Sequence, residues 1–313
     1  MGVPLKVPVP LVLLTLLLFS PVPLRAEKEI RIVATTTALA NLATEIAGDK
    51  AEIYSIASPR QSLHFIAPTP KDVLKVKKAE VFIHIGLDLE AWRPALVDAA
   101  GRPDFICPWG SRQIDASRGV ALLEIPVTLS RTEGDIHAYG NPHYWLDPDN
   151  GKTAARNIAE GLARLYPGEA PLFRKNEEAF QKRLGQKIKE WEEILSPYRG
   201  RSIVTYHRSW SYFAERFGLR VVGELEPKPG IPPTAKHLAG LEKIMREQNV
   251  KVIVKETFYE KRTPEKLARE TGAKVVELAQ AVGEVKEVKD FAGMIDYNVR
   301  QLAGGFKETE GSP

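Results

Sequence analysis

The segment Asn141-Pro142-His143-Tyr144-Trp145-Leu146-Asp147-Pro148 places an imidazole in front of a short aromatic run and ends in a turn. Two other histidines have similar settings far away in the sequence, namely His64 in Ser62-Leu63-His64-Phe65 and His207 in Thr205-Tyr206-His207-Arg208. Neutral imidazole is a good ligand for zinc and other late first-row metals. We therefore interpret the fold as one that brings these three rings around a single transition-metal ion. Their spacing alone does not require this, because only the folded chain can assemble them.

Residues 1–26 have the pattern of a secretory signal peptide that is cleaved after Ala26. Lys6 precedes an apolar run from Val7 to Phe19, and prolines and small residues follow. This run is shorter than the roughly 20 apolar residues that a membrane span requires. Because Cys107 is the only cysteine, we expect no lipid anchor after cleavage. Export without an anchor favours the periplasm of a double-membraned bacterium.

The composition is that of a globular protein with two domains. The chain has 313 residues, of which 43% are hydrophobic and 27% are charged, and domains usually contain 50–250 residues. The formal net charge of +4 falls to +2 when Lys6 and Arg25 are removed with the signal peptide. That balance provides neither a basic stripe for nucleic acid nor a polybasic membrane patch. We expect a monomer without a nucleic-acid partner.

Short apolar segments alternate with helical patterns along most of the chain. Strands are expected at residues 29–34, 51–57, 80–85, 202–206, 220–225, 251–255 and 274–278. The expected helices include one at Leu89–Ala99 and a final one near Phe291–Ala303. Strands that alternate with helices at this spacing predict βα units and mainly parallel sheets. We therefore expect an α/β fold with two lobes, an N-terminal lobe over residues 27–168 and a C-terminal lobe over residues 198–306, followed by a tail over residues 307–313.

A long helix is expected between the two lobes, within residues 169–197. Apolar residues recur at helical spacing from Phe173 to Leu195, and Glu, Lys, Arg and Gln fill the opposite face. This segment spans about 35 Å at 1.5 Å per residue, which is enough to cross a whole lobe. We interpret it as a rigid connection that leaves a cleft between the lobes. Ligands of parallel sheets gather beyond the carboxyl ends of strands, and His64, His207 and Glu256 each follow an expected strand.

Four parts of the sequence resemble the periplasmic metal-binding proteins of zinc and manganese ABC transporters, the cluster A-I solute-binding family. The similarity runs from about Ile32 to the final helix. It rests on Leu63-His64-Phe65 with Pro68-Thr69-Pro70-Lys71-Asp72, on residues 79–82 with Gly86-Leu87-Asp88-Leu89-Glu90-Ala91-Trp92, on Asn141–Pro148, and on Val204-Thr205-Tyr206-His207 with residues 212–213 and 217–219. The resemblance implies a binding protein without catalytic activity, in which His64 and His143 from the first lobe and His207 from the second hold the transported metal. It also implies an inner-membrane ABC permease as the partner.

The chain departs from the family at the fourth ligand. Members usually place an aspartate in a Leu-Asp-Pro-Leu-Gly-like stretch after the last strand, where this chain has Leu278-Ala279-Gln280-Ala281-Val282-Gly283. The nearest candidate carboxylate is Glu256, which ends the neighbouring strand, and we predict it as the fourth metal ligand. A structural carboxylate is the alternative role for Glu256, and water or a residue of the 130–138 loop could then occupy the fourth position.

Three histidines and at most one carboxylate favour Zn²⁺ over Mn²⁺ as the transported ion, because manganese prefers more oxygen donors. Family members selective for zinc often carry a long His-rich loop before the second ligand. Here that loop is short, and its Glu133, Asp135 and His137 could capture metal weakly, although a solvated loop is the simpler interpretation.

Two alternatives to zinc uptake remain open. One is a member of the same family that is selective for manganese or iron, or that also adheres to host surfaces. The other is a zinc hydrolase, since three histidines with an open position also form a catalytic site and Glu256 would then be the general base. The sequence contains no HExxH helix and no nucleophile elbow, which argues against the hydrolase.

Overall fold

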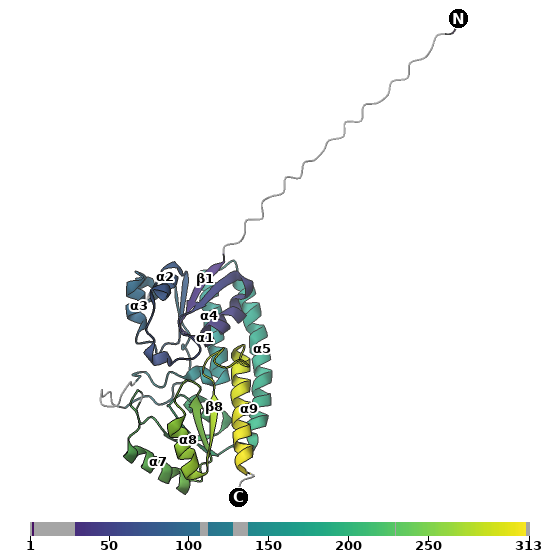
Figure 1. The fold of residues 1–313 in the computed structure, drawn as a ribbon. Coiled ribbons are helices and arrows are strands. Elements are labelled where there is room, and N and C mark those ends of the chain that lie inside the picture. Colours follow the sequence, from purple (N-terminus) through teal and green to yellow (C-terminus); the bar gives the residue numbers. More distant parts are fainter. Residues whose placement is uncertain (1, 3–28, 107–111, 128–136, 229, 311–313) are drawn as a thin grey trace.

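A computed structural model describes residue 2 and residues 29–106, 112–127, 137–228 and 230–310. Two α/β lobes lie end to end, and one long helix, α5, runs beside both of them (Figure 1). The expected signal peptide, residues 1–26, and Cys107 lie outside the described part, apart from Gly2. Within the described ranges, no helix combines the length and the apolar character needed to cross a membrane.

The first lobe is built on a four-stranded sheet with strand order β2-β1-β3-β4, in which all pairs are parallel. Its strands are β1 (Ile30–Ala34), β2 (Ala51–Ser55), β3 (Val81–His84) and β4 (Gln113–Asp115). Its helices are α1 (Thr37–Ala47), α2 (Pro70–Lys78), α3 (Arg93–Ala99) and α4 (Pro148–Leu165).

The second lobe repeats this arrangement, with strand order β6-β5-β7-β8 and parallel pairs throughout. Its strands are β5 (Ser202–Thr205), β6 (Arg220–Glu224), β7 (Val252–Glu256) and β8 (Lys274–Leu278). Its helices are α6 (Ser211–Phe217), α7 (Ala235–Glu247), α8 (Arg262–Thr271) and α9 (Phe291–Glu310). In both sheets, the strand that comes first in the sequence lies between the second and the third. The order in which strands are added to the sheet therefore reverses at this first strand. Parallel sheets bind ligands at such points.

The connecting helix α5 covers Ala170–Leu195. Its buried face contains the expected apolar residues from Phe173 to Leu195, and it packs against α1 and α4 of the first lobe and α9 of the second. The helix begins before Phe173 because Pro171 occupies its first turn, where proline's missing N–H costs nothing. One helix therefore holds both lobes.

The hydrophobic core is continuous from one lobe to the other. A single cluster of buried side chains includes members of both sheets, of α5 and of α9. At the start of α9, the Phe291 ring packs so closely on Gly151 of α4 that a Cβ at this glycine would collide with it. The backbone N–H of Phe291 also donates to Oδ1 of Asn41, at 2.8 Å. This shared core opposes a wide opening of the lobes.

Three elements differ from the expectation. Strand β4 has only three residues and was not predicted, because so short an edge strand has no alternating pattern. The helix expected at Leu89–Ala99 begins only at Arg93, since Leu87 and Asp88 adopt left-handed backbone conformations with φ of 54° and 59°. The last helix continues to Glu310, beyond the expected end near Ala303.

Candidate metal centre

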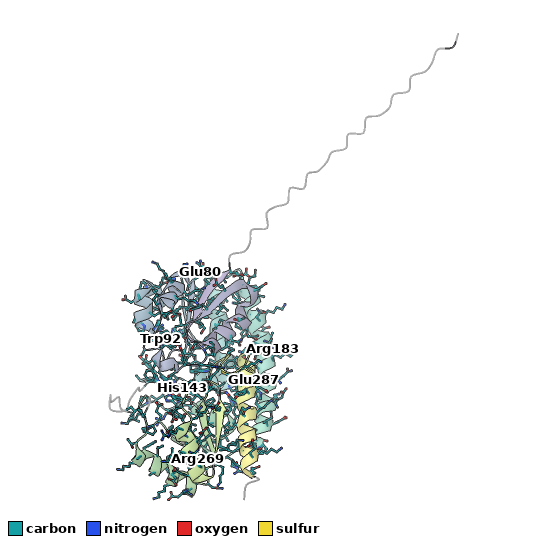
Figure 2. All side chains as sticks on the ribbon, viewed as in Figure 1. Glu80, Trp92, His143, Arg183, Arg269 and Glu287 are labelled. Carbon is teal, nitrogen blue, oxygen red and sulfur yellow. The ribbon has the colours of Figure 1, made fainter. Side chains whose placement is uncertain are left out.

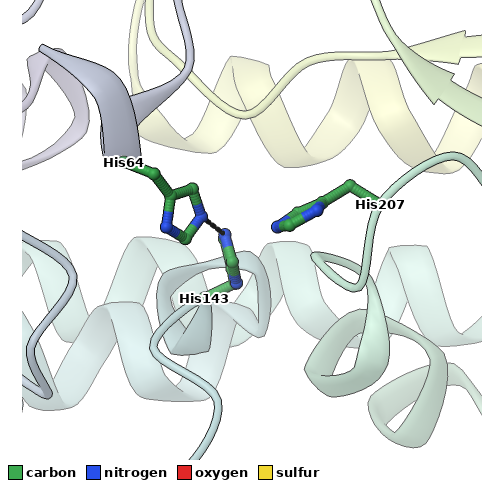
Figure 3. A group of neighbouring side chains, drawn as sticks. All are labelled: His64, His143 and His207. Carbon is green, nitrogen blue, oxygen red and sulfur yellow. Dashed lines mark hydrogen bonds between the residues drawn. The ribbon is translucent and has the colours of Figure 1, made fainter. Parts of the chain in front are cut away.

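Three buried histidines converge at the level where the two lobes meet, as the position of His143 shows (Figure 2). One ring nitrogen from each of His64, His143 and His207 lies within 4.8 Å of the other two. Figure 3 shows the three rings facing a common point, with the Nε2 atoms of His64 and His143 3.2 Å apart. The structure thus brings together three of the four predicted site residues.

The spacing of the rings matches a tetrahedral metal site. Ring centroids are separated by 5.1 Å for His64 and His143, 5.1 Å for His64 and His207, and 5.3 Å for His143 and His207. Imidazoles bound to a tetrahedral zinc ion at about 2.1 Å would have centroids roughly 5 Å apart. The ring centroids therefore have about the separation that such a site requires.

His64 lies in a short 3₁₀ turn, Leu63–Phe65, between β2 and α2. The indole N–H of Trp92 donates to the carbonyl of Leu63, at 3.0 Å. After the turn, the backbone N–H of Asp72 donates to Oγ1 of Thr69, and Oδ2 of Asp72 accepts from the backbone N–H of Thr69. This capping box fixes where α2 begins, so both ends of the His64 loop are anchored.

His143 is oriented by Asn141, two residues earlier. Oδ1 of Asn141 accepts from the backbone N–H of His143 and lies 2.9 Å from its Nδ1. Because an amide oxygen only accepts, Nδ1 carries the proton and Nε2 presents its lone pair to the site. Burial, with the neighbouring histidines adding to it, holds the pKa of His143 well below its usual value. The ring is therefore neutral, as a metal ligand must be.

His207 follows β5 by two residues and is oriented by a carboxylate. Its Nδ1 lies 2.6 Å from Oε2 of Glu226, and the exposed fractions of the two side chains are only 5% and 10%. The carboxylate accepts a hydrogen bond from the protonated Nδ1, which leaves the Nε2 lone pair of His207 for a metal. Glu226 was not predicted as a site residue from the sequence. Glu226 follows β6, which pairs with β5. Because the carboxyl ends of adjacent parallel strands lie side by side, this position was the feature of the sequence that could have identified it.

Glu256 lies outside the group formed by the three histidines. It is completely buried at the end of β7. Its Oε1 accepts from the Trp210 indole N–H at 3.1 Å and from the Gln280 side-chain amide at 2.6 Å, while its Oε2 has no hydrogen-bond partner among the described residues. Burial raises the pKa of this carboxyl from 4.5 to about 7. In this conformation the contacts of Glu256 are those of a structural carboxylate.

The other histidines have separate settings. His137 stacks obliquely on His64 with ring centroids 5.0 Å apart, whereas Glu133 and Asp135 of the same loop lie outside the described residues. His84 is buried in β3, where burial lowers its pKa to about 3. Nε2 of His237 lies 2.8 Å from the carbonyl of Glu224. Only His137 therefore adjoins the three-histidine group.

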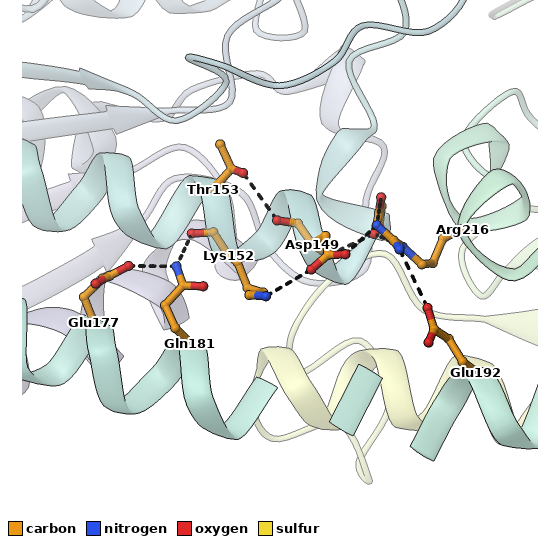
Figure 4. Close-up of polar contacts among 8 residues, drawn as sticks. Asp149, Lys152, Thr153, Glu177, Gln181, Glu192 and Arg216 are labelled. Atoms are coloured by element: carbon orange, nitrogen blue, oxygen red, sulfur yellow. Dashed lines mark hydrogen bonds and ion pairs between the residues drawn. The ribbon is translucent and has the colours of Figure 1, made fainter. Parts of the chain in front are cut away.

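A network of charged groups around Arg216 ties the two lobes together (Figure 4). Arg216 of α6 donates to both oxygens of Asp147, which caps α4, at 2.9 and 3.3 Å. It also lies 2.6 Å from Asp149 and 3.7 Å from Glu192 of α5. One guanidinium thus connects the second lobe, the start of α4 and the connecting helix.

Two α/β lobes, each with a parallel sheet, are joined by a long helix and have three histidines between them. This arrangement defines a solute-binding protein for a metal ion. The chain belongs to the family described as zinc-uptake complex component A, periplasmic, whose sequence model matches residues 32–305. It is the metal-binding, extracytoplasmic component of an ABC transporter and not an enzyme. The resemblance found in the sequence is thereby confirmed, and the hydrolase alternative is not supported.

Similar proteins carry names with different metals. The iron-binding protein YfeA of Yersinia pestis is 28% identical over 288 residues, which cover 89% of this chain and 87% of YfeA. The zinc-binding protein AdcA of Streptococcus pyogenes is 24% identical over 292 residues, and this chain spans 56% of its length. A solved structure of FpvC from Pseudomonas aeruginosa with Mn²⁺ superimposes with a TM-score of 0.78 at 23% identity, covering 90% of this chain and 100% of FpvC. The fold is therefore shared, whereas the metal varies.

Proposed function

We propose that this protein captures Zn²⁺ in the periplasm and delivers it to an inner-membrane ABC permease, with His64, His143 and His207 as the metal ligands. The observation that carries this proposal is the convergence of three buried imidazole nitrogens from both lobes within 4.8 Å. Both His143 and His207 have hydrogen-bond partners that keep Nε2 available for an ion. An ion held by both lobes would stabilise their closed arrangement.

The donor atoms favour zinc over the other metals named among the relatives. Imidazole suits zinc, whereas manganese prefers carboxylate, carbonyl and water oxygens. The group contains three nitrogen donors and no carboxylate from the described residues. We propose that a water molecule takes the fourth position, and we assign Glu256 a supporting role because Trp210 and Gln280 already hold its Oε1.

The lobes should move little when the ion binds and leaves. The continuous core, α5 and the Arg216 network all oppose a wide hinge motion. Residues 1–26 would direct export and be removed after Ala26, and the mature protein would act as a monomer without a lipid anchor.

A competition experiment tests the choice of metal. Mature protein stripped of metal would be titrated with Zn²⁺ and with Mn²⁺ against a chromophoric chelator, and protein purified from the periplasm would be analysed for bound metal. We expect one equivalent of zinc per chain and a zinc affinity that exceeds the manganese affinity by at least about 100-fold, which corresponds to about 2.7 kcal/mol. Equal affinities, or native protein that carries manganese or iron, would refute the assignment of zinc.

A further inference from the structure

We propose that Glu226 is a positioning residue that sets the metal affinity of this site, both by orienting His207 and by adding a negative charge behind it. This inference rests on the proposed function, since it concerns the strength with which the three histidines hold an ion. It assigns the role to a carboxylate that would contact a ligand and not the metal itself.

Glu226 is held in one position from three sides. Its Oε2 lies 2.6 Å from Nδ1 of His207, and its Oε1 accepts from the backbone N–H of Gly230 at 2.8 Å. Its own backbone N–H donates to the carbonyl of Tyr206 at 2.9 Å, beside His207. The carboxylate is therefore fixed against the imidazole before any metal arrives.

The contact has two separable effects on His207. Orientation is the first: a group that only accepts keeps the proton on Nδ1, so the Nε2 lone pair faces the site. Charge is the second: a carboxylate behind a ligating imidazole makes the ring a stronger donor, and such partners commonly change metal affinity by about 10- to 100-fold. Any acceptor would provide the orientation, but only an anion provides the charge.

The charge matters here because the three-histidine group provides no anionic ligand from the described residues. His143 donates its Nδ1 hydrogen bond to the neutral amide oxygen of Asn141, and Glu256 is directed to Trp210 and Gln280. Three neutral ligands leave the full charge of a divalent ion uncompensated in a buried site. Glu226 offers partial compensation through His207.

The variant Glu226→Gln separates the two effects, because its amide oxygen can still accept from Nδ1 while the charge is lost. We expect Glu226→Gln to weaken zinc binding by about 10-fold or more, with only a small decrease in the melting temperature of the metal-free protein, because the amide nitrogen would face the exposed backbone N–H of Gly230. The matched control is Glu224→Gln, which removes a carboxylate two residues away that pairs with Arg208 at 3.4 Å. The control should keep the zinc affinity of the wild type within about twofold, since surface ion pairs contribute little.

A nitrogen-15 spectrum of the metal-free protein gives an independent measurement of the orientation. His207 should carry its proton on Nδ1 in the wild type and in Glu226→Gln, and should lose this preference in Glu226→Ala. Protonation of Nε2 in the wild type would overturn the inference, as would wild-type affinity in Glu226→Gln or equal losses in Glu226→Gln and Glu224→Gln. Failure of the proposed function is distinguishable, because the wild type itself would then not bind zinc.

Discussion

The two lobes share one strand order but hold their site residues differently. In the first lobe, His64 and His143 lie on turns, and the group that contacts Nδ1 of His143 is the neutral amide of Asn141. In the second lobe, His207 is backed by the carboxylate of Glu226, and Glu256 is buried nearby at the end of β7. The comparison teaches that one scaffold can place a neutral amide behind a ligating histidine in one lobe and a carboxylate behind a ligating histidine in the other.

Two buried glutamates, Glu90 of the first lobe and Glu256 of the second, also differ in how their oxygens are bonded. Glu90 of the first lobe accepts from the hydroxyl of Thr35 and from the backbone N–H groups of Ile85 and Gly86, so both its oxygens are satisfied. Glu256 of the second lobe has one satisfied oxygen and one without a partner. Burial raises the pKa of both carboxyls. Both oxygens of Glu90 therefore accept hydrogen bonds, whereas Oε2 of Glu256 can still accept one.

The largest expected effect tests whether both lobes contribute to one site. His143→Ala and His207→Ala should each lower the zinc affinity by about 100-fold or more, because binding free energies of roughly 10–16 kcal/mol for structural zinc sites are shared among four ligands. Isothermal titration or chelator competition would measure this. His237→Ala is the control, since its ring contacts the Glu224 carbonyl instead of the site. A large loss in only one of the two variants would show that the lobes do not share the ion.

An intermediate effect should distinguish the two buried glutamates. The folded-state pKa of Glu256, about 7, lies above its ordinary value of 4.5, so ionisation of this carboxyl opposes folding and stability falls as the pH rises between these values. In the metal-free protein, Glu256→Gln should remove this pH-dependent decrease in the free energy of unfolding, which amounts to at most about 3 kcal/mol. Denaturant unfolding at several pH values would measure it.

The matched variant in the first lobe is Glu90→Gln, which should behave in the opposite way. An amide nitrogen there would face a backbone N–H donor, and an unsatisfied buried donor costs about 1–3 kcal/mol. Glu90→Gln should therefore destabilise the protein at neutral pH, while Glu256→Gln should not. Equal destabilisation by the two variants would contradict the contrast between the lobes.

The smallest expected effect concerns the connection between the lobes. Arg216→Ala should lower the free energy of unfolding by about 1–2 kcal/mol, because it removes partly buried hydrogen bonds between charged groups. Thermal unfolding would measure the change. Arg300→Ala is the control: its ion pair with Asp296 lies within one helix, and the Arg300 side chain is 59% exposed, so we expect a change within about 0.5 kcal/mol. If Arg216→Ala left the free energy of unfolding unchanged, the hydrophobic core alone would hold the lobes together.

Much of the fold could be predicted because local patterns in the sequence determine it. Apolar segments that alternate with segments of helical periodicity predict parallel βα units, and the apolar face from Phe173 to Leu195 predicts α5. The failures are where tertiary contacts override local preference. Strand β4 exists because it pairs with β3, and α3 starts late because the Leu87–Asp88 backbone turns first.

The prediction of the site was uneven for a related reason. The histidines stand in recognisable segments, so His64, His143 and His207 could be named in advance, and the structure places their rings together. Glu256 was chosen for its place at the end of a strand, a position that says nothing about the direction of its side chain. Glu226 has no motif of its own, because its contact with His207 arises from the pairing of β5 with β6.

The sequence by itself determined the α/β character, the two lobes, the connecting helix and the three candidate imidazoles, because residue periodicity and short motifs are local properties of the chain. Only the tertiary structure decided which ring nitrogen faces the site, which carboxylate lies behind His207 and that Glu256 is directed to Trp210 and Gln280. Those features depend on side-chain directions between segments far apart in sequence, and such directions are fixed only when the two sheets, α5 and the shared core have packed.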